Sequence, residues 1–229
     1  MKGVIVALLA VGILGCENMG SKSTKLETNT DSVSYMIGFN IGRNLSKDSI
    51  KVNYDAFVRG LDDASADSAK RLMTDSVLQL TMDKFQNDMQ MRQMSSMKAL
   101  SEKNKADGEA FLSENKTKEG VVTLPSGLQY QVITEGKGPS PKANQTVSAN
   151  YRGTFIDGKE FDNSASRGGP AQFRVDEVIP AWSEALQQMK VGSKWLVWAP
   201  PNLAYGEHGS RSIPPNSALI FEIELVGIQ

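Results

Sequence analysis

The chain has 229 residues, of which 25 are basic and 26 acidic, giving a formal net charge of −1. This length allows one large domain or two modest ones, and the balanced charge gives no indication of a nucleic-acid partner or a polybasic membrane patch. The single cysteine, Cys16, excludes an intrachain disulfide and a cysteine-cluster metal site. The single histidine, His208, excludes paired-histidine metal sites and argues against Ser-His-Asp chemistry, because it lies in a Gly- and Ser-rich loop. We therefore expect no metal and no cofactor.

Residues 1–15 predict an export signal. Lys2 is followed by an apolar run from Val4 to Leu14, which is too short to span a bilayer but typical of a signal-peptide core. The run ends in Ile13-Leu14-Gly15-Cys16, which resembles a bacterial lipobox. The resemblance implies cleavage before Cys16 and lipidation of that residue. The alternative is a plain secretory peptide with an incidental cysteine.

Residues 16–30 are polar and predict a flexible tether. Several acyl chains on Cys16 would anchor the mature protein stably, whereas one chain binds a membrane only marginally. We therefore expect a lipoprotein of the bacterial cell envelope. The favoured location is the outer membrane, with the globular part facing the periplasm or the cell surface.

Residues 31–116 predict a helical domain. Its first helix is indicated by apolar residues at every fourth position, at Val33, Ile37, Ile41 and Leu45. Either Thr30 or Asp31 can cap this helix. A second short helix is predicted after Asn53 by the spacing of Tyr54, Phe57, Val58 and Leu61.

The third predicted helix is long. It starts after Thr74 and continues without proline to about Asn115, which would give a length on the order of 65 Å. Gly108 is the interior residue that favours a break or bend. A helix of this length cannot bury itself within the segment, so it needs a partner or serves as a solvated spacer.

Residues 117–229 predict a β-rich domain. Apolar and polar residues alternate between positions 146 and 155, with the period of a half-buried strand. Asp157-Gly158 is a hairpin signal, and the segments 194–199 and 219–226 supply further strands. The expected class is α+β, an antiparallel sheet with one short helix laid across it.

The short helix of this domain is predicted from Trp182 to Met189, and Gly192 ends it. Val178 and Ile179 precede Pro180 and should be extended, because proline disfavours helical backbone in the residue before it. A tryptophan at the start of a one-faced helix can form the floor of an apolar cavity. Ordinary core packing of Trp182 is the alternative.

Four motifs of this domain occur together. They are Gln145-Thr-Val-Ser-Ala-Asn-Tyr-Arg-Gly153, Phe161-Asp162, Tyr205-Gly206 and Ile213-Pro-Pro-Asn216, set around the segment 176–192. In this order and spacing they resemble the FKBP-type peptidyl-prolyl isomerases over residues 117–229. The resemblance implies cis–trans isomerisation of X-Pro bonds, with proline-containing unfolded polypeptides as substrates. It also implies binding of macrolide FKBP inhibitors.

The same resemblance implies a proline pocket with Trp182 as its floor. Its predicted catalytic residues are Phe161, Asp162, Trp182, Tyr205 and Phe221, and its predicted substrate-binding residues are Tyr151, Arg167, Val178, Ile179 and Ile213. The Tyr205 hydroxyl and the Ile179 N–H match donors to substrate carbonyls. Asp162 matches a pocket carboxylate held by polar neighbours such as Arg167. Core packing of the individual aromatic residues, and a plain turn role for Asp162, are the alternatives.

The helical segment has its own resemblance. Ser34-Tyr-Met-Ile-Gly-Phe-Asn-Ile-Gly42 and the segment 104–116 look like the N-terminal dimerisation domain of macrophage-infectivity-potentiator-type FKBPs. This implies a homodimer through residues 31–116, with the third helix carrying each catalytic domain. Gly38 and Gly42 would permit close helix contact. A monomeric helical cap is the alternative.

Some positions depart from the family pattern. Ala181 stands where many relatives carry glycine, and Ala171 stands where some carry a further pocket phenylalanine. The loop 207–212 is about one residue shorter than usual, and Ser212 replaces a commonly apolar residue. These changes affect the expected substrate preference rather than the activity. The rival functions are a holdase chaperone or proline-binding module with incidental catalysis, and a purely structural lipoprotein.

Overall fold

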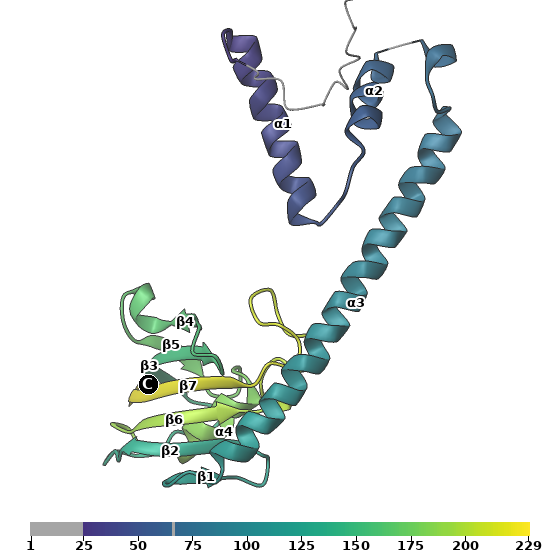
Figure 1. The fold of residues 1–229 in the computed structure, drawn as a ribbon. Coiled ribbons are helices and arrows are strands. Elements are labelled where there is room, and N and C mark those ends of the chain that lie inside the picture. The colour runs from purple at the N-terminus through teal and green to yellow at the C-terminus, as the bar shows by residue number, and fades with distance from the viewer. Residues whose placement is uncertain (1–24, 66) are drawn as a thin grey trace, which may run out of the picture. The chain divides into compact units, whose positions relative to one another are not determined.

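The computed structural model describes residues 25–65 and 67–229 (Figure 1). The predicted signal peptide, the lipobox cysteine Cys16 and most of the predicted tether lie outside the described residues. Among the described residues, no helix combines the length and apolar character needed to cross a membrane. The chain divides into two compact units, and the division along the sequence falls between Val77 and Leu78.

The first unit contains two predicted helices, α1 (Asn29–Lys47) and α2 (Tyr54–Ala64). The predicted caps of α1 are wrong, because the helix begins two residues earlier with Thr28 as its N-cap. Asp31 N–H donates to Thr28 Oγ1 over 3.1 Å, and Thr28 N–H donates to Asp31 Oδ2 over 2.8 Å. This reciprocal capping box satisfies two backbone donors, which explains the earlier start. Asn53 caps α2 as the sequence suggests, accepting from Ala56 N–H over 3.0 Å.

Helix α3 (Asp75–Asn115) has 41 residues, which corresponds to roughly 60 Å. It is continuous through Gly108, so the break favoured there is absent. A Cβ atom at Gly108 would lie 3.1 Å from the Ala218 Cβ atom. The glycine is therefore explained by close packing against Ala218, which lies just before β7 in the same unit, rather than by a bend.

The second unit is built on an antiparallel sheet of seven strands (Figure 1). The strand order is β1-β2-β6-β7-β3-β4, and β5 pairs with β3 beside β4. The strands are β1 (Val121–Thr123), β2 (Gln129–Thr134), β3 (Thr146–Phe155), β4 (Glu160–Asn163), β5 (Ala171–Arg174), β6 (Lys194–Ala199) and β7 (Leu219–Ile228). The two ten-residue strands β3 and β7 pair along their whole length at its centre.

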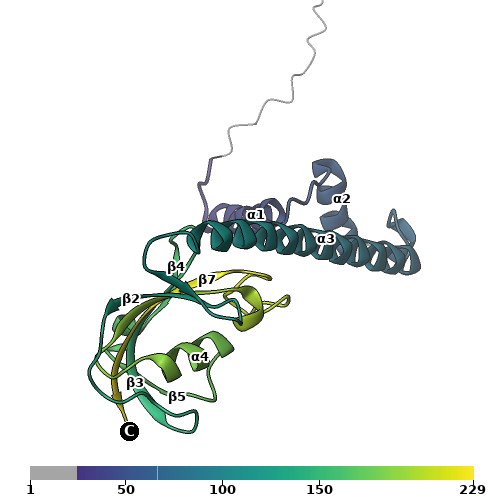
Figure 2. The same cartoon turned by 90° about the horizontal axis from the view of Figure 1, so that it is seen from below.

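The sheet curves around helix α4 (Pro180–Gln188), as Figure 2 shows. Pro180 occupies the first helical position, where its missing N–H costs no hydrogen bond. The helix buries Ala181, Trp182, Ala185 and Leu186 against the inward-facing residues of the sheet. This α+β arrangement confirms the predicted fold class.

Candidate active site

A cavity of about 390 Å³ opens between the first turn of α4 and the edge of the sheet formed by β4 and β5. Four strands, the first turn of α4 and two loops each contribute one to three side chains, so the cavity exists only in the folded domain. Its lining residues are Tyr151, Phe161, Asp162, Phe173, Glu177, Val178, Ile179, Trp182, Tyr205 and Phe221.

Trp182 forms the floor of this cavity and is 4% exposed. Three rings meet the indole edge-on, with centroid distances of 5.1 Å to Tyr151, 5.2 Å to Phe173 and 5.7 Å to Phe221. Edge-to-face pairs of this kind are favourable because the positive ring edge meets the negative ring face. The indole is therefore fixed by contacts from three different strands.

Phe161 closes one wall of the cavity. Its ring packs edge-on against Phe221, at a centroid distance of 5.8 Å. It also packs in a tilted arrangement against Phe155, at 5.0 Å. A Cβ atom at Gly153 would lie 2.6 Å from the Phe161 ring. Only glycine on strand β3 therefore leaves room for Phe161 in this position.

Asp162 brings a carboxylate to the rim of the aromatic wall. Its Oδ2 atom accepts from the Tyr151 hydroxyl over 2.8 Å, and its Oδ1 atom accepts from Arg167 over 2.7 Å. The Asn163 N–H also donates to Oδ1, over 2.9 Å. Three donors on two oxygen atoms fix the carboxylate in one orientation.

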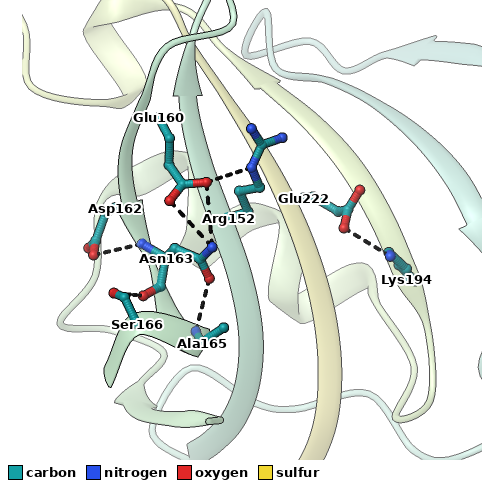
Figure 3. A network of polar contacts seen from close by, with 8 residues as sticks. All are labelled: Arg152, Glu160, Asp162, Asn163, Ala165, Ser166, Lys194 and Glu222. Carbon is teal, nitrogen blue, oxygen red and sulfur yellow. Dashed lines mark hydrogen bonds and ion pairs between the residues drawn. The ribbon is translucent and has the colours of Figure 1, made fainter. Parts of the chain in front are cut away.

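Asn163 caps the short turn Ser164–Arg167, whose last residue is Arg167. Figure 3 shows the contacts of Asn163. The Asn163 side-chain oxygen accepts from the Ala165 N–H over 2.9 Å, and the Asn163 backbone carbonyl accepts from the Ser166 hydroxyl over 2.7 Å. The Asn163 side-chain amide also donates to the carboxylate of Glu160 over 3.4 Å. The same carboxylate accepts from Arg152 Nε of β3 over 2.7 Å. Asp162 and Arg167 therefore rest on a connected polar network.

Two tyrosine hydroxyls belong to the site. Burial raises the pKa of Tyr151 to about 12, and its hydrogen bond to Asp162 acts in the same direction. The pKa of Tyr205 is also raised, first by burial and then by the charge of Asp162. Both phenols are therefore neutral donors at physiological pH. In the described part of the chain, neither the Tyr205 hydroxyl nor the Ile179 N–H has a hydrogen-bond partner, which leaves both available to a ligand.

The structure brings eight of the ten predicted pocket residues into the cavity lining. Arg167 is outside the lining and contacts Asp162 instead. Ile213 is 3% exposed and belongs to the hydrophobic core, so it is not among the lining residues. Their functional roles stay predictions.

Phe173 and Glu177 line the cavity although the sequence analysis did not select them. Phe173 lies two residues after Ala171, and residues two apart in a strand point to the same face. Because Ala171 matches a pocket position of the family, this spacing could have predicted that Phe173 lines the cavity. Glu177 lies just before Val178 in an exposed turn, where an acidic residue has no distinguishing pattern.

The fold and the cavity define a class of protein that binds an apolar ring between aromatic walls and supplies two hydrogen-bond donors at the rim. Comparison with known families identifies the class. Residues 30–132 match the domain amino-terminal to FKBP-type peptidyl-prolyl isomerase, and residues 138–226 match the FKBP-type peptidyl-prolyl cis-trans isomerase domain.

Several relatives match this chain along almost their whole length. The chain is 40% identical to the outer membrane protein MIP of Legionella longbeachae, with 100% of this chain and 98% of the relative covered. It is 39% identical to the peptidyl-prolyl cis-trans isomerase Mip of Coxiella burnetii, covering 100% and 99%. The crystal structure of FkpA from Escherichia coli superimposes with a TM-score of 0.75 at 37% identity, covering 90% of this chain and 99% of FkpA. The chain belongs to the FKBP-type peptidyl-prolyl cis-trans isomerase family, which confirms the resemblance seen in the sequence.

The raised pKa of Tyr151 can be tested by titration. The folded state favours the neutral phenol, so this stabilisation is complete below the ordinary tyrosine pKa of about 10 and is lost as the pH rises through the folded pKa. We expect the difference in tyrosinate absorbance between the wild type and Tyr151→Phe to appear near pH 12 for the folded chain. In urea it should appear near pH ~10. Coincident curves in the two conditions would contradict the buried, hydrogen-bonded state of this hydroxyl.

Proposed function

We propose that the chain accelerates rotation about X-Pro bonds in exported proteins, with the proline ring bound over Trp182. The observation that carries this proposal is the set of three aromatic rings around the indole, with two free donors at the rim. Family membership supports the same activity. No nucleophile is required for this reaction.

The physical basis is differential binding of the twisted transition state. Amide resonance sets a rotational barrier of about 18–20 kcal/mol. As the bond twists, the charge-separated resonance form is lost, so an apolar cavity favours the transition state over the planar ground state. The Tyr205 hydroxyl and the Ile179 N–H would hold the neighbouring carbonyl groups while the proline ring stays over Trp182.

The rival proposal is a holdase or proline-binding module in which catalysis is incidental. Exposed apolar side chains on α1, α2 and the first part of α3 give it some support. Catalysis of a short peptide separates the two proposals, because a short peptide needs only the cavity. A macrolide inhibitor of the family should abolish that catalysis by occupying the cavity.

Tyr205→Phe tests the proposed donor. Removing one hydrogen bond made in the transition state should lower kcat/KM for a proline peptide by roughly five- to tenfold. Tyr130→Phe is the matched control, because Tyr130 stacks on Trp195 at a centroid distance of 4.1 Å and does not line the cavity. A proline-limited peptide assay measures both variants, and equal rates for Tyr205→Phe and the control would sink the assignment.

We also propose a lipid anchor at Cys16 and a location in the outer membrane. The lipobox-like sequence supports the lipid anchor. The outer-membrane location is supported by similarity to the outer membrane protein MIP of Legionella longbeachae. The domain limits follow the same proposal, with a signal peptide at 1–15, a tether at 16–30, a helical domain at 31–116 and an isomerase domain at 117–229.

Cys16→Ser tests the anchor. In bacteria expressing the variant, incorporation of labelled fatty acid should be lost and the protein should leave the membrane fraction. Ser21→Ala in the tether serves as a control that keeps the cysteine. Continued labelling of the Cys16→Ser variant would show that the lipobox assignment is wrong.

The helical domain is proposed to form a homodimer. In the described chain no residue of α1 or α2 is buried, although Phe39, Phe57, Val58 and Leu61 are all large and apolar. An amphipathic helix needs an apolar surface to cover its apolar face. Among the described residues, no atom of another element lies within 4 Å of the position of a Cβ atom at Gly38 or Gly42, so a second helix has room to approach there.

Light scattering tests the dimer. The mature wild-type chain should have twice the subunit mass, and Leu61→Asp should shift it towards the single-subunit mass, because a charge cannot be buried unpaired in an apolar interface. Asp62→Ala, at the neighbouring exposed position, is the control. A wild-type chain with the mass of one subunit would contradict the proposal.

A further inference from the structure

The last four turns of α3 are attached to the isomerase domain, whereas the preceding turns are not. From 78 to 100 every residue of the helix except Met89 is exposed. After that point exposure falls at residues that recur every three or four positions, namely Ser101, Asn104, Asp107, Gly108, Phe111, Leu112 and Asn115. This spacing places them on one side of the helix. Most of these side chains are polar or absent, so the contact depends on hydrogen bonds and close approach.

One end of this contact lies on strand β2. The Asn115 side chain donates to Gln129 Oε1 over 3.0 Å, and Gln129 Nε2 donates to the Leu112 carbonyl over 2.8 Å. Asn115 is 1% exposed. This end holds the helix to the sheet at a point that does not line the cavity.

The other end lies on the segment Pro214–Ala218. Asn104 Nδ2 donates to the Pro215 carbonyl over 2.8 Å, and Asn216 Nδ2 donates to Ser101 Oγ over 2.8 Å. Gly108 lets the helix approach the same segment at Ala218. Three successive turns of the helix therefore hold one short piece of loop.

This segment is hydrogen-bonded to the loop that carries Tyr205. The Asn216 N–H donates to the Gly206 carbonyl over 2.9 Å, and Gly206 follows Tyr205 in the chain. Asn216 has a φ of 52°, in the left-handed region that asparagine tolerates better than most residues. Its backbone thus holds the Tyr205 loop while its side chain is held by α3.

The backbone on both sides of Tyr205 is also held by Pro201, whose carbonyl accepts from the N–H groups of Ala204 and Gly206, but the Tyr205 side chain itself has few contacts. It is 39% exposed, and its hydroxyl has no hydrogen-bond partner among the described residues. The position of the hydroxyl therefore depends on the backbone that carries the ring. A donor contributes fully to a transition state only when it is already placed, because ordering it during the reaction costs free energy.

We infer that Ser101 and Asn104 of α3 are positioning residues for Tyr205. They fix Pro215 and Asn216, and through the bond from Asn216 to Gly206 they set the place of the Tyr205 hydroxyl at the cavity rim. The inference rests on the proposed isomerase function, because it assigns the α3 contact to the same site. It makes the end of the long helix part of the isomerase rather than a spacer.

Asn104→Leu is the main variant, because leucine has a similar size and favours helix but cannot donate to Pro215. In the full mature chain it should lower kcat/KM for a proline peptide about threefold, less than Tyr205→Phe itself, since positioning cannot exceed the contribution of the group positioned. Lys105→Leu, at the next and exposed residue, is the control and should match the wild type. Ser101→Ala is the second variant, in case leucine impairs folding, and should give a loss in the same direction.

Two comparisons separate positioning from general loss of stability. Gln129→Met removes both hydrogen bonds at the β2 end of the contact, so it should lower the urea midpoint without lowering kcat/KM. Asn104→Leu should have no further effect in a Tyr205→Phe background, because the two changes act on one donor. Activity losses that follow stability in all variants, or losses that add in the double variant, would overturn the inference.

A spectroscopic readout keeps the inference testable apart from the proposed function. In the chain with labelled tyrosine, the ring resonances of Tyr205, assigned with Tyr205→Phe, should shift in Asn104→Leu and stay unchanged in Gln129→Met and Lys105→Leu. Unchanged Tyr205 resonances in Asn104→Leu would refute positioning. An inactive wild type with shifted resonances would overturn the proposed function and leave the positioning role established.

Discussion

The edge-on packing of Tyr151, Phe173 and Phe221 around Trp182 is the constraint on which the rest of the site depends. Each pair of this kind is worth about 0.5–1.5 kcal/mol beyond the area it buries. The three rings come from β3, β5 and β7, so they meet the indole only when the sheet curves around α4. Catalysis of X-Pro rotation needs a rigid apolar surface under the proline ring. The same contacts that close the hydrophobic core also build that surface.

The polar part of the site depends on a second, smaller constraint. Asp162 is held by Tyr151 and Arg167, and Arg167 stands on a turn that Asn163 caps. This network fixes the β4 side of the cavity, while the loop after β6 that carries Tyr205 is held by backbone hydrogen bonds to Pro201 and by Asn216. The two sides of the cavity are therefore stabilised by different means. Hydrogen bonds within the domain hold Asp162, whereas Tyr205 depends on a loop that contacts helix α3.

Much of the fold could be predicted because it follows simple periods. The strand β3 alternates with a period of two, and α1 and α2 repeat at helical spacing. The predicted helix from Trp182 to Met189 overlaps most of α4, which begins at Pro180 and ends at Gln188, four residues before the predicted stop at Gly192. Most of the cavity lining followed from a family resemblance, since no pattern in a single chain says that Tyr205 and Phe161 meet. The cap of α1 was misplaced because Thr28, Thr30 and Asp31 are all good caps, and only the three-residue spacing of the capping box chooses Thr28. Strands β4 and β5 have four residues each, which is too short for alternation to be recognised.

The docking of α3 could not be predicted from an apolar pattern, because most residues of the docking surface are polar or glycine. Ser101, Asn104 and Asn115 would be counted as solvent-facing, and Gly108 as a helix breaker that costs about 1 kcal/mol relative to alanine. In the structure the same glycine is what brings the helix within contact of Ala218. A weak helix position and a polar stripe are thus two consequences of one requirement, the close approach of α3 to the loop. Since Asn216 of that loop also donates to the carbonyl of Gly206, the residue after Tyr205, the inferred role of α3 links the end of this helix to the geometry of the cavity.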